Sequence, residues 1–142
     1  MLDIVVYEDN MEFLQKDVSS INLALADYNI DYRIHKCKCY DDEIDVLIKK
    51  REGKKIYILG GEVNEVSGLE VAAKIREYDW DSIIIVTTNS SKYKDDILYT
   101  RLMILDFVFN SSDSDNRLMD DIILYYYDNR ILRCGICCVW RS

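Results

Sequence analysis

The feature that most constrains the fold of this chain is a regular alternation of short apolar runs with longer segments of helical periodicity. Most of the short runs are brief, nearly continuous and rich in β-branched residues, which is typical of buried strands. They lie at residues 2–7, 31–40, 56–59, 82–87 and 104–109, and a segment with helical spacing of apolar residues follows each of them. Five strands that alternate with five helices predict an α/β fold, an open parallel sheet covered by helices on both faces.

Individual segments predict where some of these elements begin and how deeply they are buried. Residues 31–40 alternate between apolar and polar side chains, which favours a less buried edge strand. Asn10 or Asp9 is expected to cap the first helix, and Ser67 the third, because their side-chain oxygens can accept hydrogen bonds from free backbone N–H groups. The last two helices are predicted at residues 95–102 and 115–132.

Length and charge exclude several classes of protein. The 142 residues suffice for about one domain, with a core that needs no disulfide or metal. Acidic residues outnumber basic ones by 26 to 18, a formal charge of −8, which disfavours direct binding of nucleic acid or of a membrane surface. No apolar stretch is long enough to span a bilayer, and the first residues do not resemble a secretion signal. Five unevenly spaced cysteines favour reduced thiols and a cytoplasmic location.

Polar residues follow several of the predicted strands, at the edge of the sheet where sites in such folds lie. Glu8 and Asp9 come directly after the first strand, and adjacent carboxylates are suitable ligands for Mg²⁺. The alternative is that they only cap the following helix and interact with its dipole. Thr87 ends the fourth strand, where its hydroxyl could donate to a phosphoryl oxygen or simply be solvated.

Four segments together resemble the receiver domain of response regulators in two-component signalling. They are the acid pair at 8–9, IYILGGEVNEVSGLEVAAKIRE at 56–77, IIIVTT at 83–88 and ILDFVFN at 104–110. The resemblance covers residues 1–128 and is nearest to receivers that precede LytTR-type DNA-binding domains, so that residues 129–142 would be a tail or a linker stub. It implies a flavodoxin-like (βα)5 three-layer sandwich whose parallel five-stranded sheet has the order 2-1-3-4-5.

The chain departs from the family at two positions that carry phosphate chemistry. The acceptor aspartate of the family lies eight residues before the glycine that is Gly68 here, and that position is Gly60. Glycine has no side chain, so no covalent phosphoryl intermediate can form there. The family's lysine after the fifth strand, which would stabilise the phosphoryl charge, is replaced by Asn110. An introduced substitution could explain Gly60 alone, but Asn110 argues against it.

Other positions of the family pattern are retained. Thr87 keeps the hydroxyl position, and Phe107 occupies the place of the aromatic switch residue. A metal ion would keep only Glu8, Asp9 and a backbone carbonyl near Glu62, so we expect no cofactor, or at most weak Mg²⁺ binding. The side chain of Glu62 could also swing into the vacated position and act as a fixed negative charge, although a solvated loop glutamate is favoured.

This combination predicts a phosphorylation-independent pseudo-receiver, a regulatory interaction module in signal transduction or transcription control that is not an enzyme. In one alternative, the domain accepts phosphate from a histidine kinase on another acidic residue. In another, it binds a small anion in the strand-end cleft, where Gly60 and Gly61 would let the anion approach the backbone. We expect a protein partner: a sensor kinase, an effector domain or a second copy of the chain.

The C-terminal region carries aromatic residues that are candidates for an interface, and three cysteines. Tyr125 and Tyr126 lie in the predicted last helix, on the face that receivers use for output and dimerisation, and exposed tyrosines are favoured interface anchors. Simple core packing is the alternative. The last cysteines contain a C-x-x-C spacing but follow a helix, which disfavours a redox or zinc site. They are Cys134, Cys137 and Cys138. The only histidine, His35, is predicted to be a surface position of the second strand.

Overall fold

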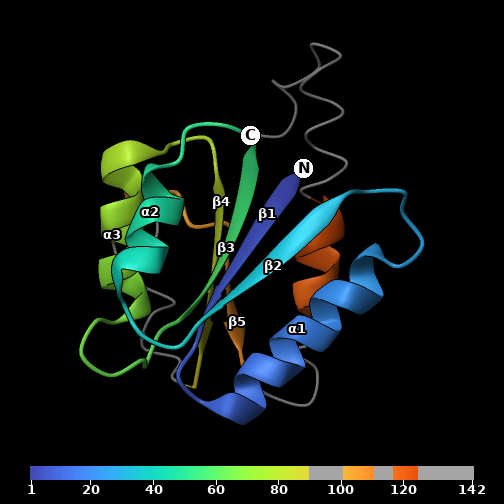
Figure 1. The fold of residues 1–142 in the computed structure, drawn as a ribbon. Coiled ribbons are helices and arrows are strands. Elements are labelled where there is room, and N and C mark those ends of the chain that lie inside the picture. The colour runs from blue at the N-terminus through green and yellow to red at the C-terminus, as the bar shows by residue number, and fades with distance from the viewer. Residues whose placement is uncertain (90–100, 111–116, 125–142) are drawn as a thin grey trace.

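The computed structural model describes residues 1–89, 101–110 and 117–124, which form three layers (Figure 1). The middle layer is a sheet, and helices cover both of its faces. The strands are β1 (Leu2–Tyr7), β2 (Tyr32–Cys37), β3 (Lys54–Gly60), β4 (Ile83–Thr88) and β5 (Asp106–Phe109). Helices α2 (Asp42–Lys49) and α3 (Gly68–Tyr78) lie on one face, and α1 (Met11–Leu25) and a helix at residues 117–124 lie on the other. The predicted α/β fold is confirmed.

The five described strands are parallel and lie in the order β2-β1-β3-β4-β5. This is the order that the receiver resemblance implied. The register pairs Tyr7 with Leu59, and Gly60 with Thr87. Because parallel strands end at the same edge of a sheet, the residues after β1, β3 and β4 lie side by side.

The core is divided into two clusters, one on each face of the sheet. Successive side chains of a strand point to opposite faces, so Val5 and Tyr57 pack under α2 and α3, whereas Ile4 and Ile56 pack under α1. Apart from its first residue, β1 is buried throughout. A central parallel strand that is covered on both faces needs an unbroken apolar run, which explains why the runs in the sequence do not alternate.

Polar side chains mark the starts of the helices as predicted. The Oδ1 atom of Asn10 accepts a hydrogen bond from the backbone N–H of Phe13 at 3.1 Å. At α3, Oγ of Ser67 accepts from the N–H of Glu70 at 3.3 Å. Each of these oxygens satisfies a backbone donor that has no partner inside its helix. Of the two candidates for the cap of α1, Asn10 is therefore the one used.

The remaining predictions about elements are met where the structure describes them. β2 is an edge strand with a half-buried pattern, as its alternating sequence indicated. Residues 117–124 are helical within the predicted 115–132, and Leu118 and Ile122 pack into the core on the α1 side. Most of the predicted helix at 95–102, and the whole of the tail at 129–142, lie outside the described residues.

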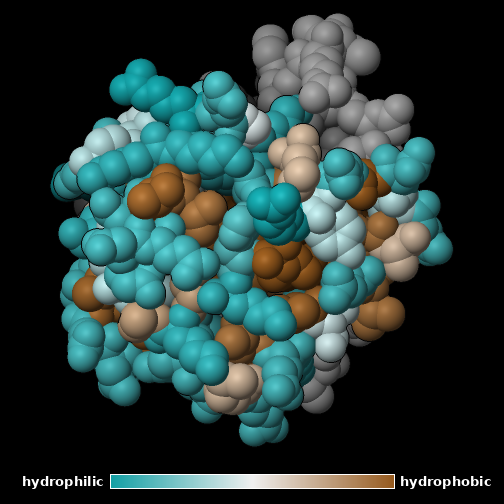
Figure 2. Space-filling model, in the orientation of Figure 1, coloured by the Kyte–Doolittle hydropathy of each residue, from teal (hydrophilic) through white to brown (hydrophobic). Residues whose placement is uncertain are grey.

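The exposed surface is mainly polar. Figure 2 shows one face of the molecule, on which hydrophilic residues predominate and apolar side chains appear in small separate areas. Within the described ranges, no helix has both the length and the apolar character needed to cross a membrane.

Candidate functional site

Three residues form a row across the carboxyl edge of the sheet. Glu8 follows β1, Gly60 ends β3, and Thr87 is the register partner of Gly60 in β4. The residues two positions before them all belong to the core cluster on the α1 side, and they are Val6, Ile58 and Ile85. Since side chains alternate along a strand, the three positions are on the same face of the sheet. The middle one has no side chain.

The side chain of Glu8 occupies the space that Gly60 leaves. A Cβ atom at position 60 would lie 2.8 Å from Oε1 of Glu8 and 2.9 Å from a methyl carbon of Val63, closer than real Cβ atoms approach other atoms. Glu8 is 5% exposed, and its Oε2 accepts the backbone N–H of Asn10 at 3.2 Å. The carboxyl group of Glu8 therefore lies beside Gly60.

The surroundings of Glu8 favour its neutral form. Burial raises the pKa of this carboxyl, and the adjacent carboxylate of Asp9 raises it further, against the opposing effect of the Asn10 N–H. A carboxyl group that resists ionisation is a poorer ligand for a cation, because metal ligands must be deprotonated.

Asp9 interacts with Glu8 and also with the loop between β3 and α3. Its Oδ2 accepts a hydrogen bond from the backbone N–H of Asn64 at 3.1 Å. Among residues 1–89, 101–110 and 117–124, no three acidic, histidine or cysteine side chains are grouped as a metal site. Magnesium requires a near-octahedral shell of oxygens, which two carboxylates turned in this way do not supply. The residues as arranged do not fit a Mg²⁺ site.

The hydroxyl of Thr87 is present but has no partner in the described part of the chain. Thr87 is 2% exposed, and its Oγ1 is buried without a hydrogen bond. Buried polar atoms are rarely left in this state. Its neighbour in the register is Gly60, which offers no side chain to accept the proton. The Thr87 hydroxyl is therefore a buried donor without an acceptor among the described residues.

Glu62 is an exposed glutamate of the loop between β3 and α3, as favoured from the sequence, and it also accepts hydrogen bonds from the end of β4. Although exposed, its Oε1 accepts the hydroxyl of Thr88 at 2.5 Å and the backbone N–H of Asn89 at 2.8 Å. These bonds tie the loop between β3 and α3 to the end of β4. Tyr7 holds the same loop, because its hydroxyl donates to the carbonyl of Val66 at 2.6 Å. Glu62 therefore connects the loop after β3 to the end of β4 through its carboxylate.

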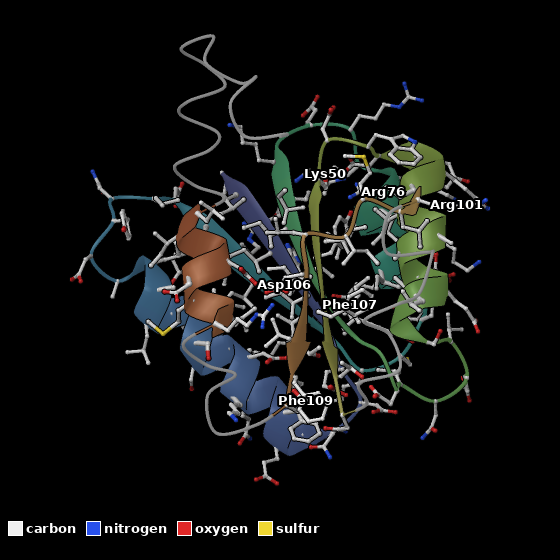
Figure 3. All side chains as sticks on the ribbon, turned by 180° about the vertical axis from the view of Figure 1, so that it is seen from behind. Lys50, Arg76, Arg101, Asp106, Phe107 and Phe109 are labelled. Carbon is white, nitrogen blue, oxygen red and sulfur yellow. The ribbon has the colours of Figure 1, made fainter. Side chains whose placement is uncertain are left out.

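Asn110 and Phe107 frame the other side of the edge. The backbone N–H of Asn110 donates to the carbonyl of Thr88 at 2.8 Å, so Asn110 directly follows the β4–β5 pairing. Phe107 is half-buried and packs against the core cluster under α2 and α3. Figure 3 shows Phe107 and Asp106 on opposite sides of β5. The position of the aromatic switch residue is therefore filled by a ring that is directed inward.

The single histidine and two of the cysteines lie in or just after β2. His35 is half-buried rather than a plain surface residue, and its Nε2 lies 2.9 Å from Oδ1 of Asp3 on the neighbouring strand. Cys37 is buried at the end of β2 and Cys39 is exposed, and both are free thiols. The following residues lie outside the described residues: Tyr125, Tyr126, Cys134, Cys137 and Cys138.

Comparisons with known proteins identify the fold. No protein-family model and no curated protein sequence matches the chain. Solved structures do match. The response regulator TrrA of Thermotoga maritima, solved with Mg²⁺-BeF, is 22% identical over 92% of this chain and 99% of its own, with a TM-score of 0.62. A CheY-like receiver domain from Methanospirillum hungatei is 10% identical over 94% of this chain and 98% of its own, with a TM-score of 0.70.

A longer protein gives the same result. DrrB of Thermotoga maritima, an OmpR/PhoB homolog, is 18% identical with a TM-score of 0.60, and the match covers 95% of this chain but 54% of DrrB. This chain therefore spans about half of DrrB and nearly all of the TrrA structure. At such identities the likeness establishes the architecture. The chain has the fold of response-regulator receiver domains.

Proposed function

We propose that this chain, which has the receiver-domain fold, is a pseudo-receiver that regulates a protein partner without being phosphorylated. The observation that carries the proposal is the contact of Glu8 with Gly60, because Glu8 Oε1 lies where a Cβ atom at position 60 would come within 2.8 Å. The site holds its own carboxyl group in place of an acceptor side chain. Its conformation would then be set by the sequence rather than switched by a phosphoryl group.

The charges at the strand-end edge support this proposal. Glu8, Asp9 and Glu62 bring three acidic side chains to the edge, and Asn110 stands where the family has a lysine. A phosphoryl group in transfer carries negative charge that a cation must stabilise. Among the described residues of this edge, neither a lysine nor a fitting metal shell supplies that cation. We expect at most weak Mg²⁺ binding and no cofactor.

The signal would pass through a protein surface near β5. Phe109 is 44% exposed, Met103 before β5 is 57% exposed, and Leu124 is 45% exposed. Exposed apolar and aromatic side chains are typical anchors of protein interfaces. The partner would be a sensor kinase, an effector domain or a second copy of the chain. The excess of acidic residues makes this domain a poor direct binder of nucleic acid.

Intact mass spectrometry after incubation with acetyl phosphate and Mg²⁺ tests the proposal. We expect the mass of this chain to stay unchanged under conditions in which an active receiver domain gains one phosphoryl group. A gain of one phosphoryl group by the unmodified chain would overturn the proposal.

The main alternative is a competent receiver with a displaced acceptor, and the contact with Gly60 names Glu8 as that acceptor. The variant Glu8→Gln separates the two readings of a mass gain. If the wild type is phosphorylated and the variant is not, Glu8 is the acceptor and the domain is active. The other alternative, a small anion in the strand-end cleft, is disfavoured by the three acidic side chains at this edge.

A further inference from the structure

A pocket lies at the opposite edge of the sheet from the strand-end site. It has a volume of about 420 Å³ and is lined by residues around the starts of β3 and β4 and the ends of α2 and α3. Among them are Lys50, Lys55, Tyr78 and Trp80. This volume is within the range of small-molecule sites. In Figure 3, Lys50 lies at this edge and Phe109 lies at the opposite edge. The pocket is thus separate from the site described above.

The pocket is basic although the chain as a whole is acidic. Its lining contains four basic side chains, Lys50, Arg51, Lys54 and Lys55, and only two acidic ones, Asp79 and Asp81. The whole chain carries a formal charge of −8. A concave patch of the opposite sign to the rest of a surface attracts anions by focusing the local field.

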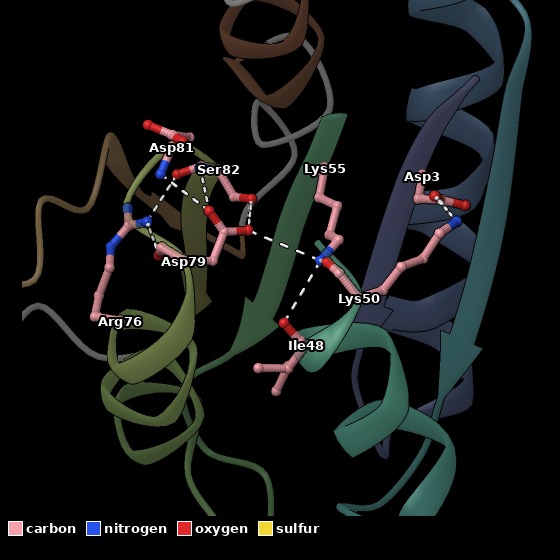
Figure 4. A network of polar contacts seen from close by, with 8 residues as sticks. All are labelled: Asp3, Ile48, Lys50, Lys55, Arg76, Asp79, Asp81 and Ser82. Atoms are coloured by element: carbon pink, nitrogen blue, oxygen red, sulfur yellow. Dashed lines mark hydrogen bonds and ion pairs between the residues drawn. The ribbon is translucent and has the colours of Figure 1, made fainter. Parts of the chain in front are cut away.

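The acidic group nearest to Lys55 is already occupied. The carboxylate of Asp79 accepts the backbone N–H groups of Asp81 at 2.9 Å and Ser82 at 3.0 Å, and also the Ser82 hydroxyl. Lys55 is 2% exposed, lies 3.9 Å from Asp79 and donates to the carbonyl of Lys50 (Figure 4). Asp79 therefore balances Lys55, whereas two other cations of the lining are more exposed to solvent.

Lys50 and Arg51 are the outer cations. Lys50 Nζ is 3.0 Å from Oδ2 of Asp3, but the lysine side chain is still 47% exposed. Arg51 is exposed and forms no ion pair with any described residue. An arginine beside a lysine is suited to a phosphate or carboxylate, because its planar fork can donate two parallel hydrogen bonds.

A rigid aromatic surface adjoins these cations. The ring of Trp80 lies over the guanidinium of Arg76 at 5.5 Å from the ring centroid, and Trp80 remains 58% exposed. Arg76 is itself fixed, because it donates to the carbonyls of Ser82 at 2.9 Å and Leu102 at 2.7 Å. One side of the indole is thus supported, and more than half of the residue is open to a second flat group. Stacked aromatic groups gain energy beyond the area that they bury.

We infer that this pocket binds a small planar anion, a molecule of nucleotide size that joins a flat ring to a phosphate group. The anionic group contacts Arg51 and Lys50, and the ring stacks on Trp80. The concave shape and the exposed indole of Trp80 fit a compact ligand better than an extended acidic peptide. The inference is independent of the proposed pseudo-receiver function, since it uses no residue of the strand-end site.

Isothermal titration calorimetry with the full chain tests this inference. The probe is adenosine monophosphate, and adenosine and inorganic phosphate serve as the separate halves. We expect the monophosphate to bind at least about tenfold more tightly than either half, because both the stacking and the charged hydrogen bonds are needed. Arg51→Ala should weaken binding by about tenfold. Trp80→Ala should also weaken it, whereas Trp80→Phe should retain most of it.

Lys36→Ala is the matched control, since Lys36 is an exposed basic residue of β2 that does not line the pocket. It should leave the affinity unchanged. Loss of binding in Lys36→Ala equal to that in Arg51→Ala would mean general charge attraction and would overturn the inference. So would the absence of binding by the monophosphate, or tighter binding of a hexaglutamate peptide. None of these results bears on the phosphorylation assay, so the two proposals fail separately.

Discussion

Oε1 of Glu8 lies 2.8 Å from the point where a Cβ atom at position 60 would be. A side chain at position 60 would therefore clash with Glu8 in its present conformation. A glutamate at position 8 in this conformation requires glycine at position 60, and glycine at 60 gives the longer acidic side chain a buried place. The side chain of Glu8 and the residue type at position 60 are therefore energetically coupled. This coupling is measurable.

Gly60→Ala should destabilise the fold by about 1–3 kcal/mol, because the added methyl overpacks the space beside Glu8 and Val63. In a Glu8→Asp background the same change should cost at least about 0.5 kcal/mol less, since the shorter acid withdraws from the methyl. Urea denaturation of the four proteins of this double-mutant cycle measures the coupling. Additive effects would mean that Glu8 does not occupy this space.

Gly68→Ala should destabilise the protein although alanine is the better helix former. A Cβ atom at Gly68 would lie 2.6 Å from the carbonyl oxygen of Gly60, a backbone atom that cannot move aside cheaply. We expect a loss of about 1–3 kcal/mol from this overpacking. Ala73→Gly, at an exposed position of α3, measures the cost of glycine relative to alanine in this helix, which should be about 1 kcal/mol. Stabilisation by Gly68→Ala in thermal unfolding would contradict the close approach of α3 to β3.

The fold could be predicted from the sequence because strands and helices produce recognisable patterns of apolar residues in short segments. Buried central strands need unbroken apolar runs, and the caps at Asn10 and Ser67 use local hydrogen bonds, so both are visible in short segments. The glycine at position 60 is read directly from the sequence, but its interpretation as a missing acceptor depends on the receiver resemblance and stays a prediction.

The arrangement of the site was not predictable in the same way. The direction of the Glu8 side chain depends on space created by Gly60, which is far away in the sequence. The bond between Glu62 and Thr88 likewise joins residues that only the sheet brings together. The buried Arg76 bonds to carbonyls of two separate loops and has no local sequence signal. Contacts of this kind belong to tertiary structure and leave no periodic pattern.

Glu62→Ala should loosen the junction between β4 and the loop after β3 without unfolding the protein. The side chain is exposed, and its Oε1 holds the backbone N–H of Asn89 at 2.8 Å. We expect hydrogen exchange at Asn89 to accelerate by about tenfold when this charged acceptor is lost. Glu62→Gln should have a smaller effect, because its amide oxygen still accepts. Glu70→Ala, which removes an exposed acid of α3 instead of one in the loop, should leave the Asn89 amide protected.

The helix at residues 117–124 should make stability depend on pH through Asp121. Arg117 donates to both carboxylate oxygens of Asp106, at 2.6 and 2.5 Å, which leaves Asp121 in a buried position beside a carboxylate. Burial raises the pKa of Asp121 from 3.8 to about 8, and the carboxylate of Asp106 adds to this rise while Arg117 opposes it. The folded protein then binds more protons than the unfolded chain between these two pH values.

The contribution of Asp121 to stability should therefore be fully present below pH 3.8 and should be lost as the pH rises toward about 8, because the Asp121 proton is lost at a cost only in the folded state. Asp121→Asn keeps the shape of the neutral acid and removes the titration. Its free energy of unfolding should equal that of the wild type at the acidic end and exceed it increasingly toward the alkaline end. Urea denaturation across this range measures the difference, with Asp120→Asn, an exposed position of the same helix, as the control. If the free energies of unfolding of Asp121→Asn and of the wild type differed by the same amount at all pH values, the prediction would be wrong. Asp121 would then have the same pKa in the folded and the unfolded protein.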